Sequence, residues 1–323
     1  MRYVRLGKTG MEVSAIALGT WAFGGEWGAF DEAEARAAIH RALDLGVTLF
    51  DTAQAYGFGR AEHLLADALG PQARRGDVFV ATKGGLRRSG KGLVRDASAG
   101  WLRAGVEASL RNLAVETIDL YQVHWPDGHT PAEETADELE ELVREGKIRH
   151  VGVSNYDVQQ MDDLGAHGYV ETTQSPYHLF RRDIEAEVLP YATLNDIGVL
   201  VYGPLAHGLL SGRMDASTTA FADDDWRHAS PDFTGETFRR NLSVVERFRA
   251  LAADRGLSLP TLAVAWTIAR PAVHAAIVGA RRPAHLDALV AAADVKLCAS
   301  TLEEIDRIVA DATAVRGPSP EGM

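Results

Sequence analysis

The 323-residue sequence is poor in cysteine and lysine and has no long hydrophobic run. Its one cysteine, Cys298, cannot form an internal disulfide, which excludes a small disulfide scaffold and fits a cytoplasmic setting best. Its longest apolar runs, such as Thr261 to Ala269, are much shorter than the ~20 residues of a membrane helix, so no membrane association is expected. The start, Met1 to Gly10, carries charges and no apolar stretch typical of a secretory signal.

Positive charge is also scarce, because 33 Lys and Arg residues oppose 45 Asp and Glu residues, which gives a formal net charge of −12. A field of this sign repels nucleic acids and anionic membranes, so neither is an expected partner. Hydrophobic residues make up 46% of the chain, which supports a large core and excludes a disordered chain. No linker rich in Pro, Gly or Ser divides the sequence, and residues 1–323 are therefore expected to form one domain. The oligomeric state is left open, a homo-oligomer included.

Short apolar, β-branched runs alternate with helical patterns along the chain. The runs expected to be strands are Ala15–Gly19, Val47–Thr52, Val78–Lys83, Ile118–His124, Arg149–Asn155, Glu171–Ser175, Val199–Gly203 and Ala275–Gly279. The stretches expected to be helices are Asp31–Leu45, Arg60–Leu69, Ala97–Leu113, Pro131–Glu145, Val158–Leu164, Asp183–Leu194, Phe238–Ala253 and Pro283–Ala293. Eight such units in a chain of this length predict an α/β fold, a closed (β/α)8 TIM barrel, with an open doubly wound sheet as the alternative.

Several segments lie outside these eight units. Residues Tyr3 to Ser14 alternate around glycines and predict an N-terminal β-hairpin that closes the lower mouth of the barrel. Residues 208–237 are expected to form a polar loop, residues 301–312 an extra C-terminal helix, and the tail from Gly317 to be frayed. The acidic residues 223–225 are interpreted as solvated, because no His or Cys ligand spacing accompanies them, and no metal site is expected.

Reactive or amide-bearing side chains end one predicted strand after another. In a barrel the carboxyl ends of all strands meet at one face, where active sites lie. Each residue alone has an ordinary structural explanation, such as a helix cap for an Asp or a satisfied core imidazole for a His. Their joint occurrence predicts one pocket that contains Asp51, Lys83, His124, Ser154, Asn155, Gln174 and Tyr202, together with Tyr56 from the loop after the second strand.

The chemistry of this set indicates a proton donor directed at a carbonyl oxygen. A phenol with a pKa of ~10 is a weak acid near neutrality, but an adjacent ammonium favours the phenolate. Asp51 is expected to hold Lys83 charged beside Tyr56, and His124 to bind the substrate oxygen. Such an arrangement suits an oxygen that gains negative charge when hydride is added to the carbonyl carbon.

From about residue 3 to about residue 312 the sequence resembles the aldo-keto reductase family. The resemblance rests on motifs that occur in order: Gly19-Thr20-Trp21, Phe50-Asp51-Thr52-Ala53 with Tyr56, Ala81-Thr82-Lys83, Asp119-Leu120-Tyr121-Gln122-Val123-His124-Trp125, Gly152-Val153-Ser154-Asn155, Gln174-Ser175-Pro176-Tyr177, Tyr202-Gly203-Pro204-Leu205, Gly208-Leu209-Leu210-Ser211-Gly212 and Ile277-Val278-Gly279-Ala280-Arg281.

The resemblance implies an oxidoreductase that reduces an aldehyde or ketone reversibly with a nicotinamide cofactor, usually NADPH. It implies that Asp51, Tyr56, Lys83 and His124 are catalytic and that Tyr56 donates the proton. It places the small carbonyl substrate among Trp21, Tyr56, His124 and Trp125. The cofactor-binding residues that it implies are Thr20, Trp21, Asp51, Ser154, Asn155, Gln174, Tyr202, Gly203, Pro204, Leu205, Ala206, Gly208, Leu210, Arg213, Gly279, Arg281 and His285.

The adenosine end departs from the family pattern. His285, Ala288 and Leu289 stand where Gln, Glu and Asn are common, so two polar contacts are missing. Arg281 and Arg282 can still pair with a 2′-phosphate, which favours NADPH and leaves use of NADH open.

Two other functions stay open from the sequence. Some members of the resembled family are cofactor-binding regulatory subunits of ion channels with slow redox turnover. A lyase or aldolase barrel would use Lys83 as a Schiff-base amine, which a neighbouring Asp51 opposes by keeping the amine protonated. The sequence does not select one physiological aldehyde or ketone.

Overall fold

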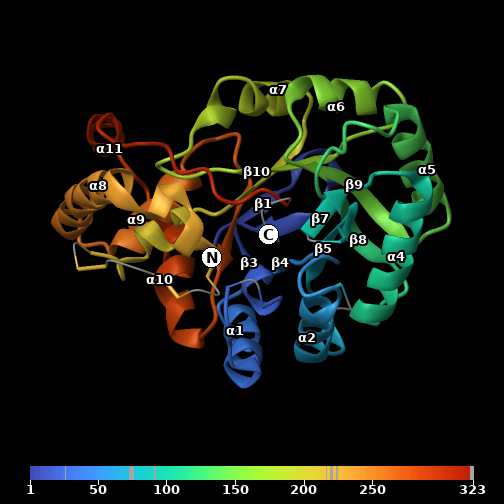
Figure 1. Cartoon of the computed structure of the whole chain (residues 1–323), viewed down its shortest axis with the longest axis horizontal. Helices are drawn as coiled ribbons and strands as arrows, with labels where there is room; N and C mark the ends of the chain where they lie inside the picture. Colours follow the sequence, from blue (N-terminus) through green and yellow to red (C-terminus); the bar gives the residue numbers. More distant parts are fainter. Residues whose placement is uncertain are drawn as a thin grey trace.

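The computed structural model describes residues 1–25, 27–72, 76–90, 92–215, 217–218, 221–222 and 225–320. Eight parallel strands form a closed barrel, in which each strand pairs with the next and β12 returns to pair with β3 (Figure 1). The predicted TIM barrel is therefore confirmed over the open sheet. The barrel strands are β3 (Ile16–Gly19), β4 (Leu49–Asp51), β5 (Phe79–Gly84), β8 (Ile118–Val123), β9 (Ile148–Ser154), β10 (Thr172–Pro176), β11 (Gly198–Tyr202) and β12 (Ala275–Gly279).

Helices surround the barrel (Figure 1), and their buried apolar side chains belong to one large core cluster with those of the strands. They are α1 (Glu32–Asp44), α2 (Arg60–Leu69), α4 (Ala99–Leu113), α5 (Ala132–Arg144), α6 (Val158–Gly165), α7 (Val188–Leu194), α8 (Gly235–Asp254), α9 (Leu259–Thr267), α10 (Leu286–Ala291) and α11 (Ala299–Val309). Asp31 caps the N-terminus of α1, since its carboxylate accepts from the main-chain N–H groups of Ala33 and Glu34. Helix α11 is the expected extra C-terminal helix.

Helix α9 was absent from the sequence prediction. Leu262, Val264 and Trp266 are fully buried, and so are the residues between them. A helix buried on every side has no polar face, so its sequence lacks the 3.6-residue periodicity by which the other helices were identified.

The N-terminal hairpin closes one end of the barrel, as predicted. Strands β1 (Tyr3–Arg5) and β2 (Glu12–Ser14) pair antiparallel, and Leu6 packs with barrel-interior residues such as Leu200 in one buried cluster. The N–H of Lys8 donates to the carbonyl of Asp196, 2.8 Å away and just before β11 begins. Ligands therefore reach the barrel from the carboxyl ends of the strands, the opposite mouth.

A second hairpin, not predicted, follows β5 at that mouth. Strands β6 (Leu86–Ser89) and β7 (Gly92–Arg95) pair antiparallel. Their eight residues contain as many arginines as Leu and Val residues, three of each, so the alternation typical of a strand is weak. The indole N–H of Trp101 donates to the carbonyl of Leu86 at 3.2 Å and ties the hairpin to α4.

Hydrogen bonds hold the chain just before the tail that is expected to be frayed from Gly317, and residues 321–323 of that tail lie outside the described residues. The N–H of Val315 donates to the carbonyl of Phe180 at 3.1 Å, and the N–H of Arg316 donates to Asp232 Oδ2 at 2.8 Å. Arg181 in turn donates to the carbonyl of Arg316. These bonds hold the red C-terminal segment across the open mouth of the barrel (Figure 1).

Two absences hold for the described part of the chain. None of its helices is long and apolar enough to cross a membrane. None of its His, Cys, Asp and Glu side chains forms a group of three or more that could hold a metal ion, while Asp223 and Asp224 lie outside the described residues.

Candidate active site

The centre of the open mouth is a buried ion pair between neighbouring strands. Asp51 ends β4, and Lys83 on β5 lies two residues beyond Ala81, the partner of Asp51 in the register. Lys83 Nζ donates to Asp51 Oδ1 at 2.6 Å, to the carbonyl of Thr52 at 2.9 Å and to Tyr56 Oη at 3.4 Å. These acceptors match the three hydrogens of an ammonium. Burial lowers the pKa of Lys83, and the Asp51 carboxylate opposes that shift.

Tyr56 and His124 complete the set of four. The ring centroids of Tyr56 and His124 are 5.7 Å apart in an edge-to-face arrangement, and Trp21 stacks 6.3 Å from Tyr56. Burial, together with the charge of Lys83, holds the pKa of His124 well below its ordinary value, so its imidazole is neutral near pH 7. The structure thus brings the four predicted catalytic side chains together at one mouth.

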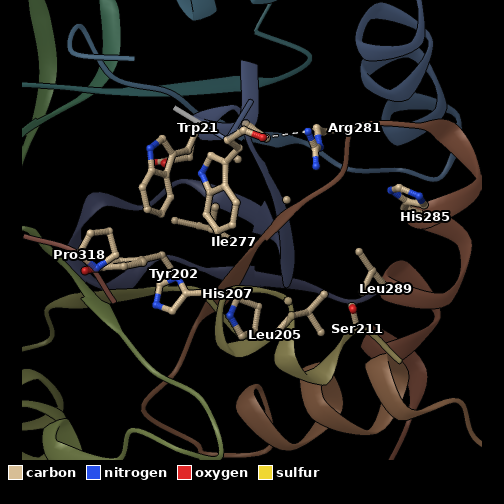
Figure 2. Close-up of a pocket in the computed structure, with 18 of the residues that line it drawn as sticks. Trp21, Tyr202, Leu205, His207, Ser211, Ile277, Arg281, His285, Leu289 and Pro318 are labelled. Carbon is tan, nitrogen blue, oxygen red and sulfur yellow. Dashed lines mark hydrogen bonds between the residues drawn. The ribbon is translucent and has the colours of Figure 1, made fainter. Parts of the chain in front are cut away.

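A cavity of about 550 Å³ begins at this centre and extends across the mouth. In Figure 2, Trp21, Tyr202, His207 and Pro318 gather at one end, and Ser211, Arg281, His285 and Leu289 at the other. Predicted residues that line it are Trp21, Asp51, Tyr56, His124, Trp125, Ser154, Asn155, Gln174, Tyr202, Gly203, Pro204, Leu205, Gly208, Arg213, Gly279, Arg281 and His285. Thr20, Ala206 and Leu210 do not line it, because their side chains are buried in the protein interior.

Amide and hydroxyl groups form a network at the first end. Gln174 Nε2 donates to Asp51 Oδ2 at 2.8 Å, and Asn155 Nδ2 donates to the carbonyl of His124 at 3.0 Å. Tyr202 Oη donates to Asn155 Oδ1 at 2.8 Å, and Ser154 Oγ bonds the carbonyl of Gln174 at 3.0 Å. Asn155 has a φ of +63°, a left-handed conformation that asparagine adopts more readily than most residues other than glycine.

The other end is cationic. Arg213 contacts His285 Nε2, and Arg281 Nη1 donates to the carbonyl of Trp27 at 3.2 Å, as the dashed line in Figure 2 marks. Burial lowers the pKa of Arg281 and of His285, and the neighbouring arginines lower both further. Positive charges held this close together are stabilised by an anion between them.

A second cavity of about 290 Å³ shares Trp21, Tyr56 and His124 with the first. Its outer walls come from Phe58 and from the β6–β7 hairpin. Trp125 lines only the larger cavity, and the Arg95 guanidinium lies 4.6 Å from its ring centroid. Tyr56 and His124 therefore lie between the two spaces.

An aromatic group over the first cavity was not predicted from the sequence. Trp27 stacks on His207 with ring centroids 6.3 Å apart, and it meets Trp226 edge to face at 5.7 Å. His207 has a φ of +55° and lies in the loop after β11. These residues come from separate loops without a shared motif, so no sequence signal indicated their contact.

The residues around the larger cavity fit a nicotinamide dinucleotide. Amide groups at one end match a carboxamide, and arginines at the other match phosphates. His124 Nδ1 and His207 Nε2, both on residues that line this cavity, are buried and have no hydrogen-bond partner among the described residues. Buried polar atoms of this kind favour a polar ligand beside them.

Comparison with known proteins agrees with this geometry. The model of the Aldo/keto reductase family matches residues 15–310. The chain belongs to this family. It is 45% identical to aldo-keto reductase YhdN of Bacillus subtilis over 291 residues, which are 90% of this chain and 88% of the relative. It is 33% identical to the NADH-specific methylglyoxal reductase of Escherichia coli over 313 residues, 92% and 95% of the two chains.

Two solved structures share the architecture of this aldo-keto reductase. The glycerol dehydrogenase AKR11B4 from Gluconobacter oxydans has a TM-score of 0.88 and 39% identity over 98% of both chains. The holo form of aldo-keto reductase AKR11C1 from Bacillus halodurans has a TM-score of 0.80 and 27% identity, covering 97% of this chain and 98% of its own. The family connects the chain with reduction of carbonyl compounds and with a nicotinamide cofactor.

Proposed function

We propose that the protein reduces small aldehydes or ketones to alcohols, reversibly, with NADPH as the preferred cofactor. The observation that carries this proposal is the position of Tyr56 at the junction of the two cavities, with its Oη 3.4 Å from the Lys83 ammonium, which is bonded to Asp51 at 2.6 Å. A phenol beside a buried ammonium is a suitable proton donor to an oxygen that gains negative charge.

The cofactor would lie in the larger cavity, where Ser154, Asn155 and Gln174 would bind the carboxamide and Tyr202 would support the ring. When bound, the reduced nicotinamide supplies hydride to the carbonyl carbon. Arg213 and Arg281 would bind phosphate groups at the other end.

The protein's own residues handle the oxygen and its proton. His124, neutral near pH 7, donates a hydrogen bond to the carbonyl oxygen and orients it toward Tyr56. Tyr56 donates its proton to that oxygen, and the Lys83 ammonium stabilises the phenolate left behind. In the oxidative direction the same phenolate accepts the proton of the alcohol, as microscopic reversibility requires.

The preference for NADPH rests on Arg281 and the exposed Arg282, which can bind a 2′-phosphate. Ala288 and Leu289 line the same end without polar side chains, and one relative is named for NADH specificity. We therefore expect a modest preference for NADPH rather than exclusive use.

The hydrogen bonds of Lys83 oppose the aldolase alternative. Its Nζ lies within hydrogen-bond distance of three acceptors, Asp51, Thr52 and Tyr56, which favours the ammonium, and an ammonium has no lone pair to attack a carbonyl. Borohydride added with a carbonyl substrate is expected to leave no adduct on Lys83, as peptide mass mapping would show.

The test is Tyr56→Phe, followed by stopped-flow oxidation of NADPH with 4-nitrobenzaldehyde. The variant is expected to lose at least about 100-fold in rate, because the proton donor is gone, while NADPH still quenches tryptophan fluorescence as in the unmodified enzyme. Tyr3→Phe, at the closed end of the barrel, is the matched control and retains the full rate. An unchanged rate in Tyr56→Phe would show that Tyr56 is not the proton donor.

A further inference from the structure

The second cavity is placed where a substrate reaches the reacting groups. It has a volume of about 290 Å³, at the small end of ligand sites, and Tyr56 and His124 lie at its junction with the larger cavity. Under the proposed function, the dinucleotide fills the larger space. A substrate carbonyl that meets Tyr56 from the other side then has its remaining atoms in the second cavity.

The β6–β7 hairpin contributes both apolar side chains and one cationic side chain to the wall of this cavity. In the antiparallel register Leu86 pairs with Arg95 and Arg88 pairs with Leu93, so these side chains share one face of the hairpin. Leu86, Arg88 and Leu93 line the cavity, and Leu86 is almost fully buried. Arg88 lies two residues farther along the strand, about 7 Å from Leu86, and is exposed.

The charge of Arg88 is held in place but not neutralised. Its guanidinium lies 4.0 Å from the ring centroid of Phe58, which also lines the cavity. Within the described part of the chain Arg88 forms no ion pair, and the described residues that line this cavity include no Asp or Glu. Arg87, on the opposite face of the same strand, is bonded to Asp96 at 2.7 Å. The cation on the cavity side is thus available to a ligand.

We propose that Arg88 selects carbonyl substrates that carry an anionic group, a carboxylate or a phosphate, at the end remote from the carbonyl. The apolar middle of such a substrate contacts Phe58, Leu86 and Leu93, and its anionic end reaches the Arg88 guanidinium. This inference rests on the proposed function, because it takes Tyr56 as the point where the carbonyl binds. It adds a substrate class that neither the family nor the names of the relatives specify.

Two aldehydes of nearly equal shape test the selection. 4-Carboxybenzaldehyde carries a carboxylate opposite its aldehyde, and 4-nitrobenzaldehyde carries a neutral group of the same outline. Arg88→Gln is expected to raise KM for the carboxylate about 5- to 10-fold and to leave both KM and kcat for the nitro compound nearly unchanged. In the unmodified enzyme, KM for the carboxylate alone is expected to rise with added NaCl.

The control is Arg87→Gln, which removes a charge from the same strand on the face away from the cavity. It is expected to leave the preference between the two aldehydes unchanged. If Arg88→Gln raised KM for both aldehydes equally, or for neither, the residue would not recognise charge and the inference would be wrong.

A binding measurement separates this inference from the proposed function. Terephthalate has a carboxylate at each end of the same ring, and its binding beside Trp21 is followed by tryptophan fluorescence without turnover. If neither aldehyde is reduced by the unmodified enzyme, the proposed function fails. A dissociation constant for terephthalate that rises at least about 5-fold in Arg88→Gln and not in Arg87→Gln would then still support the anion site, and equal constants would reject it.

Discussion

Arg281 donates a hydrogen bond from Nη1 to the main-chain carbonyl of Trp27, across 3.2 Å and 254 positions of sequence. Trp27 in turn packs on Trp226, and Arg227 lies 5.2 Å from the Trp27 ring centroid. The loop after β3 is therefore tied to the loops after β11 and β12, over the larger cavity. Arg281, which the sequence predicts to bind a phosphate, therefore also holds the loop with Trp27 over the larger cavity.

Arg281→Met separates these two contributions. We expect the dissociation constant for NADPH to rise about tenfold, because a charge-assisted bond to the 2′-phosphate is lost, and that for NADH to change little. Fluorescence titration with each cofactor measures both constants. The exposed Arg111→Met on α4 serves as the control. An equal loss for NADPH and NADH would mean that Arg281 acts through the Trp27 loop and not through the phosphate.

Lys83→Met leaves the Asp51 carboxylate buried without its cation. We expect a loss of about 3–5 kcal/mol in the free energy of unfolding and a fall in turnover of at least about 100-fold. Urea denaturation and stopped-flow assays measure the two effects. Lys147→Met, which removes two partly exposed ion pairs, with Glu107 and Glu145, should cost less than about 1 kcal/mol. Adding Asp51→Asn to Lys83→Met should recover part of the lost stability; no recovery would contradict an uncompensated carboxylate as the cause.

The barrel could be predicted because its strands and most of its helices carry strong local patterns. Asp31 before α1 and the short apolar run at 78–83 identify their elements without tertiary contacts. Helix α9 and the β6–β7 hairpin could not be predicted, since burial on every side removes the polar face of one and an arginine-rich sequence masks the other. In both cases tertiary packing outweighs local propensity.

The residues of the candidate site likewise include some that the sequence pattern predicts and others that it does not. Asp51, Lys83 and His124 were predictable because each ends an identifiable strand, and strand ends converge in a barrel. His207 and Arg88 were not, since their position depends on the path of a loop and on a hairpin register. Sequence therefore indicates the reacting groups more readily than the walls that select a substrate.

Acid should destabilise the protein through its buried histidines. Burial lowers the pKa of His207 to about 3, below the 6.5 of an exposed imidazole. The unfolded chain then binds a proton below pH 6.5 that the folded chain does not, so stability is present above pH 6.5 and is lost as the pH falls. Between pH 6.5 and 5, His207 alone accounts for about 2 kcal/mol.

Urea denaturation at several pH values checks this expectation. His207→Asn should flatten the fall in stability below pH 6.5, and Asn tolerates the positive φ at this position. The exposed His167→Gln should leave the pH dependence unchanged. Equal slopes in His207→Asn and the unmodified protein would show that His207 is not the titrating group.

At Gly317 the C-terminal tail lies against His207, in the loop after β11. Its φ is +77°, and a Cβ there would lie 2.3 Å from His207 Nε2. Gly317→Ala therefore forces either the tail or the imidazole to move, in addition to the cost of a left-handed alanine. Because Arg316 is bonded on both sides by Asp232 and Arg181, we expect trypsin to cleave after Arg316 slowly in the unmodified protein.

In Gly317→Ala the same bond should be cleaved several-fold faster, with removal of seven C-terminal residues that mass spectrometry detects. Gly100→Ala, on α4 with open space around its Cβ position, is the matched control and should be cleaved like the unmodified protein. Because Pro318 lines the larger cavity, release of the tail should also open that end of the cavity and speed dissociation of the cofactor. A Gly317→Ala protein as resistant to trypsin as the control would mean that the tail accepts a Cβ without leaving the barrel mouth. The tail would then contribute to the cavity wall without controlling access to it.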